Sequence, residues 1–177
     1  MKSFMPDKPL IESRGLCLVK LTPELVDSFM LDISHENVIE FRKVYRESPG
    51  PALKAALASG SSHCFAVTKD GVPLAITGIV DMNGDGLMWA VFANALKKNF
   101  VSFARASTDL VEFYHRQFPT LICDVWIKNE AIIQWLTYLG FDLEFGFAHN
   151  GQDMVRFAHS CRNVNSIVTS IQRPVIH

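Results

Sequence analysis

Two carboxylates at the end of a predicted strand are the first candidates for acid–base chemistry in this sequence. Asp81 and Asp85 lie in the segment Asp81-Met-Asn-Gly-Asp-Gly86, between two apolar runs. A carboxylate can take a proton from an amine, so both residues are candidate general bases. Asp also favours turn geometry in such a segment, and this alternative stays open. The segment is shorter than a calcium-binding loop and lacks the terminal Glu, so the sequence predicts no calcium site.

Metal and thiol chemistry have no matching spacing in the chain. The four cysteines lie far apart in apolar runs, at positions 17, 64, 123 and 161. Without a Cys-x-x-Cys pair, they indicate buried, reduced thiols of a cytoplasmic protein rather than a metal or redox site. His115, His149 and His159 are not spaced as ligands within one element, and single surface histidines are the simpler interpretation. We therefore predict no metal.

Length and composition predict one compact domain. The 177 residues are 49% hydrophobic and 20% charged, with a formal net charge of -1. No basic block or stripe is present, which removes an electrostatic case for specific nucleic-acid binding. The N-terminus lacks an apolar signal segment, and no run approaches the roughly 18 apolar residues of a membrane span. We expect no secretion and no membrane span, and the sequence predicts no oligomeric state.

The order of predicted elements indicates a single α/β (α+β) domain over residues 15–159. Apolar runs and turn residues predict strands at 15–21, 63–68, 72–80, 87–92, 120–127, 142–148 and 153–159. Helical periodicity predicts helices at 23–33, 34–45, 52–58 and 96–118, and a further helix after Asn129. The order is β-α-α-β-β-β-α-β-α-β-β around a mixed central sheet, with an N-terminal extension at 1–14. Residues 160–177 form a C-terminal arm, where Ile167, Val168 and Ile171 could form a short appended helix.

The segment from Val125 to Phe141 has the most specific spacing in the chain. Asn129 is a good N-cap, an apolar helix face follows it, and Gly140 suits a left-handed helix end. This spacing resembles the C-terminal signature of the GNAT superfamily of N-acetyltransferases. That signature is a strand, an Asn, a helix with a Tyr seven residues after the Asn, and Gly-Phe at eleven and twelve. Gly140 and Phe141 match, and with the element order the resemblance implies a GNAT-like fold.

Two functional positions of the resemblance differ in this chain. Leu136 stands where the family has its Tyr proton donor, and Tyr138, a substitute candidate, should point elsewhere on the helix. The usual Gln/Arg-x-x-Gly-x-Gly/Ala turn, which holds the coenzyme A pyrophosphate, is absent, since no glycine lies between Gly86 and Gly140. Under an acetyl-CoA-dependent reading, a backbone N–H near Phe92 would be the oxyanion donor. The candidate cofactor contacts are Phe92, Asn94, Lys97, Lys98 and Asn129.

A narrower resemblance accounts for these differences. The combination of Pro73–Gly78, Trp89, Val125-Trp126 and a closing hairpin with Phe157 is similar to the GNAT-like internal virion proteins of podovirus-type phages. The similarity spans about residues 63–159. It implies a small head- or ejection-associated protein, and its matching residues are structural, so no catalytic residue carries over.

Two hypotheses follow from the sequence. The first is a phage-encoded, catalytically degenerate GNAT-fold protein that acts as an internal virion or host-protein-binding component, in the virion or the host cytoplasm, with no cofactor. The absent glycine turn and Leu136 favour it. The alternative is a divergent acetyl-CoA-dependent N-acetyltransferase that acts on an amine or a protein. P-loop and Gly-x-Ser-x-Gly motifs are absent, so hydrolases of those classes have no support.

Overall fold

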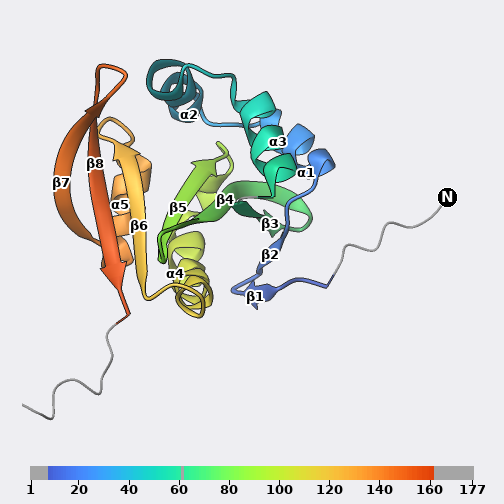
Figure 1. Ribbon diagram of the computed structural model, residues 1–177. Helices are drawn as coiled ribbons and strands as arrows, with labels where there is room; N and C mark the ends of the chain where they lie inside the picture. The colour runs from blue at the N-terminus through green and yellow to red at the C-terminus, as the bar shows by residue number, and fades with distance from the viewer. Residues whose placement is uncertain (1–7, 61, 162–177) are drawn as a thin grey trace, which may run out of the picture.

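The computed structural model describes residues 8–60 and 62–161 as a mixed α/β domain built on one eight-stranded sheet (Figure 1). The strand order is β1-β2-β3-β4-β5-β6-β8-β7. The strands are β1 Ile11–Ser13, β2 Leu16–Lys20, β3 Ser62–Lys69, β4 Val72–Met82, β5 Asp85–Phe92, β6 Thr120–Trp126, β7 Asp142–His149 and β8 Gln152–Ser160. The helices are α1 Pro23–Met30, α2 His35–Glu40, η1 Phe41–Tyr45, α3 Pro49–Ser59, α4 Leu96–His115 and α5 Glu130–Tyr138. The predicted fold class is confirmed.

The sheet opens between its two central strands. Neighbouring strands pair antiparallel throughout, except β5 and β6, which are parallel. Their pairing is confined to Gly86↔Leu121 and Leu87↔Ile122, at the beginning of each strand. Figure 1 shows the two strands diverging beyond this point, with β6, β8 and β7 on one side of the gap and β1–β5 on the other. The backbone groups of β5 that face the gap therefore need partners other than β6.

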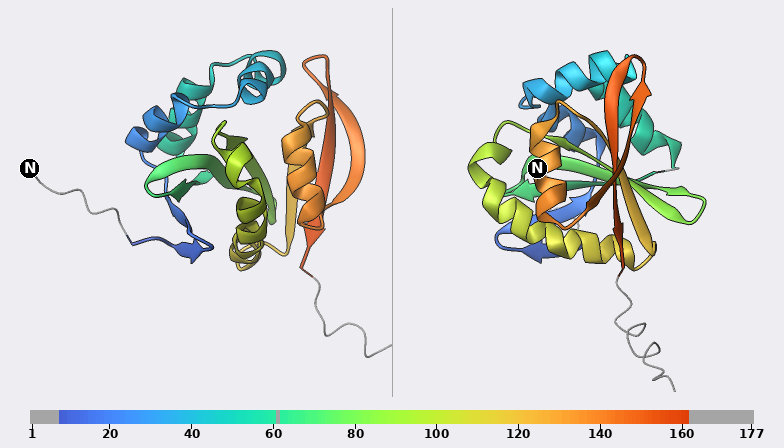
Figure 2. Two further views of the ribbon diagram at one scale, coloured as in Figure 1. Left: turned by 180° about the vertical axis from the view of Figure 1, so that it is seen from behind. Right: turned by 90° about the vertical axis from the view of Figure 1, so that its left-hand side faces the viewer.

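Helices cover the two faces of the sheet and separate the core into layers. The helices α4 and α5 lie on one face, in front of the sheet in the left view of Figure 2, and enclose the largest apolar cluster. On the other face, α1 and α3 cover a second cluster that contains Val26, Phe29 and Ile76. A third, small cluster of Val44, Trp126 and Met154 lies beneath η1. These layers bring η1, α3, β5 and β6 around the opening of the sheet.

Local sequence signals explain most helix boundaries. Thr22 and Ser34 cap α1 and α2, since their hydroxyl oxygens accept bonds from the N–H groups of Leu25 and Asn37. Asn129 caps α5 as predicted, with Oδ1 3.4 Å from the amide nitrogen of Ile132. The predicted left-handed end of α5 is also confirmed, because Gly140 has φ +82°.

Several features differ from the predicted elements, including α1, which ends at Met30 rather than at 33, and α3, which begins at Pro49 rather than at 52. The predicted helix over 34–45 is a short α-helix followed by the π-helical turn η1, a change of hydrogen-bond pattern that periodicity does not reveal. An additional strand, β1, pairs with β2 ahead of residue 15. The long helix ends at His115 rather than at 118, just before Pro119. The predicted helix in the C-terminal arm lies outside the described residues.

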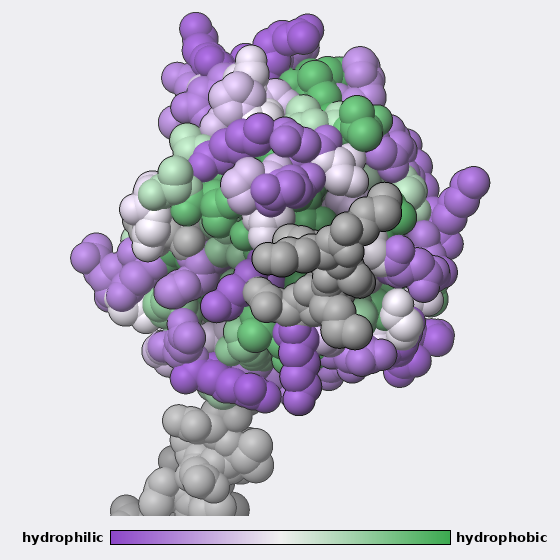
Figure 3. Space-filling model, turned by 90° about the vertical axis from the view of Figure 1, so that its right-hand side faces the viewer, coloured by the Kyte–Doolittle hydropathy of each residue, from purple (hydrophilic) through white to green (hydrophobic). Residues whose placement is uncertain are grey.

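The surface of the domain has a mixed character. Figure 3 shows that the face carrying the α1 and α3 side of the molecule is largely hydrophilic, with hydrophobic areas scattered between polar ones. Such scattered apolar surface is ordinary for a folded domain. Within the described ranges, no helix combines the length and apolar character that a membrane crossing requires.

Candidate ligand-binding site

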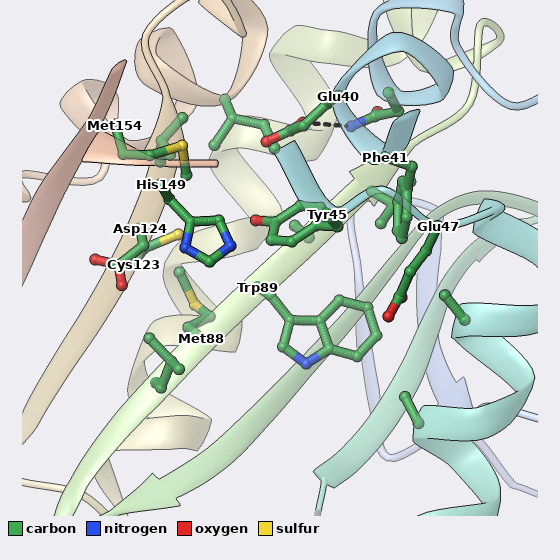
Figure 4. A pocket seen from close by; sticks show the side chains of 18 of the residues that line it. Glu40, Phe41, Tyr45, Glu47, Met88, Trp89, Cys123, Asp124, His149 and Met154 are labelled. Carbon is green, nitrogen blue, oxygen red and sulfur yellow. Dashed lines mark hydrogen bonds between the residues drawn. The ribbon is translucent and has the colours of Figure 1, made fainter. Parts of the chain in front are cut away.

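A cavity of about 400 Å³ lies where β5 and β6 diverge. Its wall comes from α2, η1 and α3 on one side, from β5 and β6 at the base, and from the β7–β8 hairpin on the other side (Figure 4). This volume falls in the range of small-molecule sites. The polar and aromatic residues of the wall are Asn37, Glu40, Phe41, Tyr45, Glu47, Trp89, Cys123, Asp124, Phe147 and His149.

Glu40, the last residue of α2, is a buried carboxyl group at this cavity. It is 6% exposed, and its Oε2 accepts hydrogen bonds from Nδ2 of Asn129 at 2.6 Å and Nδ2 of Asn37 at 3.2 Å. The Trp126 backbone also bonds the carboxyl group. Burial raises the pKa of Glu40, while these hydrogen bonds oppose the rise. Glu40 thus ties α2 to β6 and to the N-terminus of α5, across the opening of the sheet.

The π-helical turn η1 places two aromatic rings at the cavity. Phe41 and Tyr45 lie four residues apart with ring centroids 5.6 Å from each other, and both line the cavity. The Tyr45 hydroxyl points toward the side where His149 and Cys123 lie (Figure 4). Burial raises the pKa of Tyr45, so the hydroxyl stays protonated and can donate a hydrogen bond. The side chain as a whole is 40% exposed, which places its ring edge at the mouth of the cavity.

Two carboxylates of the cavity, Asp124 and Glu47, differ in whether a cation neutralises them. Asp124 of β6 makes two hydrogen bonds with Arg156 of β8, at 2.7 and 2.8 Å, so its charge is neutralised by a fork-shaped pair. Glu47 has no cationic partner within 4 Å among the residues that the structure describes. The thiol of Cys123 has a raised pKa because it is buried, which makes it a poor nucleophile.

Trp89 forms part of the cavity wall because Gly78 leaves room for it. The two residues are direct neighbours on β4 and β5, and a Cβ at Gly78 would lie 2.3 Å from Cζ2 of the indole. No real Cβ atom tolerates that distance, so the indole lies flat over the glycine. Trp89 is thereby held in the cavity wall, which Tyr45 also lines (Figure 4).

The start of α4, where the resemblance implies a pyrophosphate site, is already occupied by protein groups. The connection from β5 to α4 has only three residues, Ala93–Ala95, which is shorter than the six-residue glycine pattern. The N–H of Ala95 donates to the carboxylate of Asp32 at 2.9 Å, and the N–H of Asn94 donates to the Asp32 carbonyl at 2.8 Å. The next two amides bond carbonyls of the same turn. A phosphate would therefore meet a carboxylate instead of free N–H groups.

The edge of β5 at the gap is closed in the same way. The N–H of Phe92 donates to Oδ1 of Asn37 at 2.9 Å, and the carbonyl of Phe92 accepts from the N–H of Ser34 at 2.9 Å. Ile33 forms a β-bridge with Ala93 next to them. Asn37 of α2 and the residues just before this helix thus take the backbone positions at which an acyl carbonyl would find its donor. The residues present do not fit coenzyme A held in the way the resemblance implies.

One buried group on the α4–α5 side is left unsatisfied. Trp135 of α5 is fully buried between Phe92 and Phe103, with centroid distances of 5.5 Å to each ring. Its Nε1 has no hydrogen-bond partner among the described residues. An unpaired buried N–H is uncommon, because it costs the full desolvation of the group.

The predicted candidate base and acid residues lie outside the cavity. Asp81 accepts a hydrogen bond from the N–H of Gly84 at 2.8 Å, as the turn interpretation implies. Asp85 pairs with Met82 in the same hairpin. Tyr138 is 56% exposed on α5, whereas Leu136 is fully buried, so Tyr138 points away from the core as expected.

The predicted cofactor contacts have other partners in the structure. Lys97 lies 3.8 Å from Glu36, with both side chains largely exposed, and Lys98 is exposed. The side chain of Asn94 donates to the carbonyl of Ile33 at 3.3 Å. Asn129 reaches the cavity only indirectly, through its bond to Glu40. The backbone of Phe92 is bonded to Ser34 and Asn37.

Sequence reasoning named Trp89, Cys123 and His149, which line the cavity, but assigned none of them to a site. Glu40 and Asn129 are 89 positions apart, and no spacing rule connects them. Two carboxylates within apolar segments were the available signals, since carboxylates rarely occupy such positions without a partner. They are Glu40, next to Phe41 in the helix predicted over 34–45, and Asp124, within the strand predicted over 120–127. Glu47 carried no such signal.

Comparisons with known proteins identify the fold. No family model matches the sequence, and no curated protein matches it. Many solved structures match in fold. One is a GNAT-family acetyltransferase from Bacillus anthracis, 14% identical, covering 85% of this chain and 97% of that one, with a TM-score of 0.66.

Two further structural neighbours have ligands bound. RimL, a ribosomal alpha-N-protein acetyltransferase in complex with coenzyme A, is 12% identical and covers 86% of this chain and 98% of its own, with a TM-score of 0.64. The microcin self-immunity acetyltransferase MccE, in complex with acetyl-CoA and AMP, is 11% identical and covers 83% and 93%, with a TM-score of 0.65. At these identities the comparison shows a GNAT acetyltransferase fold. These findings give no support to the virion role implied by the narrower resemblance.

Proposed function

We propose that this protein uses a GNAT-like fold to bind a protonated amine in the cavity between β5 and β6, and that it does so without acetyl-CoA. The observation that carries the proposal is the composition of the wall. It contains the carboxyl groups of Glu40 and Glu47 and four aromatic side chains, but no Lys or Arg among its lining residues in the described part of the chain. Carboxylates and aromatic faces are the groups that attract an ammonium ion.

The occupied start of α4 supports the second half of the proposal. Asp32 holds the helix N-terminus, and Asn37 and Ser34 hold the edge of β5. A cofactor bound in the usual way would have to displace four hydrogen bonds and place its phosphates next to a carboxylate. The cavity between β5 and β6 is therefore open to an amine, while protein groups occupy the positions at the start of α4 and at the edge of β5 where the cofactor would bind.

Titration calorimetry with octylamine tests the amine proposal, with octan-1-ol as the neutral analogue. We expect octylamine to bind at least about tenfold more tightly, because the alcohol lacks the charge that the carboxyl groups attract. A cation near Glu40 also lowers the pKa of its carboxyl group, so binding should release protons, which calorimetry in buffers of different ionisation enthalpy measures. Equal affinity for the alcohol would reduce the site to an apolar pocket and contradict the proposal.

A pair of variants locates the binding site. Glu47→Gln should weaken octylamine binding about threefold or more, a modest effect because the side chain is exposed and its charge is screened. Glu144→Gln, on an exposed position of β7, makes the same charge change outside the cavity and should leave the affinity unchanged. An equal effect of both variants would point to general surface charge rather than to this cavity.

Acetyl transfer from acetyl-CoA to an amine is the second candidate. The specific observation in its favour is the orphaned Nε1 of Trp135, a buried donor beside Phe92 that a bound polar group would satisfy. The fold is shared with acetyltransferases solved with coenzyme A, and Glu40 could take the proton that an ammonium acceptor must lose. Release of free thiol from acetyl-CoA in the presence of octylamine tests it. Thiol release well above the rate without protein, and lost in Glu40→Gln, would favour this candidate over the first.

A further inference from the structure

A basic hollow lies next to the cavity, on the outer side of η1. Arg42, Lys43 and Arg46 line it together with Asn150 and Gln152 of the β7–β8 turn. Glu47 belongs to the walls of both the cavity and the hollow, so the two spaces meet at this residue. The hollow and the cavity therefore border the same residue, and the hollow has the opposite charge.

The three basic side chains have no ionic partner in the described part of the chain. None of them lies within 4 Å of a carboxylate there. Basic residues in the last turn of a helix interact favourably with its dipole, which is the simplest structural role for Arg42 and Lys43. This role does not extend to Arg46, which follows the turn.

The backbone conformation of Arg46 indicates a role other than ending the helix. Arg46 has φ +58°, a left-handed conformation in which glycine or asparagine is the usual residue. An arginine there accepts a steric cost that glycine would avoid. The turn is also fixed in place, because Nδ2 of Asn150 donates to the carbonyl of the fully buried Val44 at 2.6 Å. Arg42 and Lys43 thus lie on a fixed π-helical turn and Arg46 directly follows it, and such turns are frequent at functional sites.

We infer that the ligand of the cavity is a small amine that also carries a phosphate group, with the amine inside the cavity and the phosphate in the basic hollow. This inference rests on the proposed amine binding. Planar guanidinium groups recognise phosphate in a bidentate manner, and Arg42 and Arg46 provide two of them on neighbouring positions.

The geometry also limits the length of the ligand. Glu40, Phe41 and Tyr45 line the cavity, whereas Arg42, Lys43 and Arg46 line the hollow on the other side of the same turn. A helical turn with its side chains is about 10 Å wide. The amine and the phosphate should therefore be separated by about this distance, with an apolar or aromatic portion between them next to the rings.

Calorimetry with three alkyl probes tests the inference without any cofactor. The probes are 8-aminooctyl phosphate, octylamine and octyl phosphate. We expect 8-aminooctyl phosphate to bind at least about tenfold more tightly than either single-headed probe, with an advantage that shrinks as salt screens the phosphate contacts. Equal binding of octylamine and 8-aminooctyl phosphate would overturn the inference while leaving amine binding intact. Equal binding of octyl phosphate would overturn both.

A charge-matched pair of triple variants assigns the phosphate contact. Arg42→Gln/Lys43→Gln/Arg46→Gln should reduce the affinity for 8-aminooctyl phosphate to that for octylamine and leave octylamine binding unchanged. Lys20→Gln/Arg105→Gln/Arg116→Gln removes the same charge at exposed positions of β2, of α4 and of the residue that follows α4, and should keep the full affinity. An equal loss in both variants would show that the phosphate responds to net charge rather than to the hollow. All six residues are exposed, and circular dichroism confirms that both variants are folded.

Discussion

Replacing Glu40 by alanine should destabilise the fold more than its single side chain suggests. The change leaves three donors without their acceptor: Nδ2 of Asn129, Nδ2 of Asn37 and the Trp126 backbone. Asn129 and Asn37 are only 2% and 3% exposed, and an unpaired buried donor costs about 1–3 kcal/mol. Water entering from the adjacent cavity should satisfy part of this demand, and loss of a buried carboxyl removes its desolvation cost. We therefore expect a net loss of about 2–4 kcal/mol in the free energy of unfolding.

Urea denaturation followed by tryptophan fluorescence measures this loss. For a domain of this size, the expected loss corresponds to a fall of about 4–16 °C in Tm. Glu36→Ala is the matched control, because Glu36 lies on the same helix, is exposed, and makes only a 3.8 Å ion pair with Lys97. Such a pair contributes about 0–1 kcal/mol. If Glu40→Ala lost no more stability than Glu36→Ala, Glu40 would not tie the two halves of the sheet together.

Three further predictions concern the same region. Burial raises the pKa of Glu40 above its ordinary 4.5, so the contribution of Glu40 to stability is complete below pH 4.5 and declines as the pH rises through the raised pKa. In urea denaturation, the difference in stability between wild type and Glu40→Gln should therefore shrink from pH 4.5 upward. A difference that stays constant with pH would contradict this prediction. Gly78→Val forces the indole of Trp89 out of position, and should lower the free energy of unfolding by about 1–3 kcal/mol and weaken octylamine binding. Gly146→Ala is the control, because its added Cβ meets nothing closer than 3.5 Å, and it should change neither stability nor binding. Asp32→Ala removes the acceptor of the Ala95 N–H and should lower the free energy of unfolding, measured in urea, by about 1 kcal/mol. Asp32→Asn keeps an acceptor oxygen and should retain most of that stability. An Asp32→Ala variant as stable as wild type would show that the carboxylate does not hold the start of α4.

The fold was predictable from the sequence because the residues that mark its helix ends and turns lie close together in the chain. Asn129 and Gly140 mark the two ends of α5, and Asp70-Gly71 and Asn150-Gly151 mark two hairpins, each with positive φ at both residues. A strand was predicted over 120–127 from its apolar run, and the residues of β6 are largely buried in the structure. Such features depend on a few neighbouring residues, and their spacing is readable in one chain.

The site was less predictable because its contacts are long-range. The bond between Glu40 and Asn129 joins residues 89 positions apart, and the bond between Asp32 and Ala95 joins residues 63 apart. The absent glycines indicated that the pyrophosphate turn is lost, but not that a carboxylate takes its place. The π-helical form of η1, which divides aromatic from basic side chains, also has no signature in a pattern of apolar residues.

The most direct test of the central claim is a calorimetric titration of the protein with acetyl-CoA and then with octylamine, each alone and in the presence of the other. We predict no binding of acetyl-CoA and an octylamine affinity that is the same with and without it, because Asp32 and Asn37 already hold the groups that the cofactor needs. Binding of acetyl-CoA that also tightens octylamine binding would contradict the account and establish an acetyl-CoA site coupled to the amine cavity.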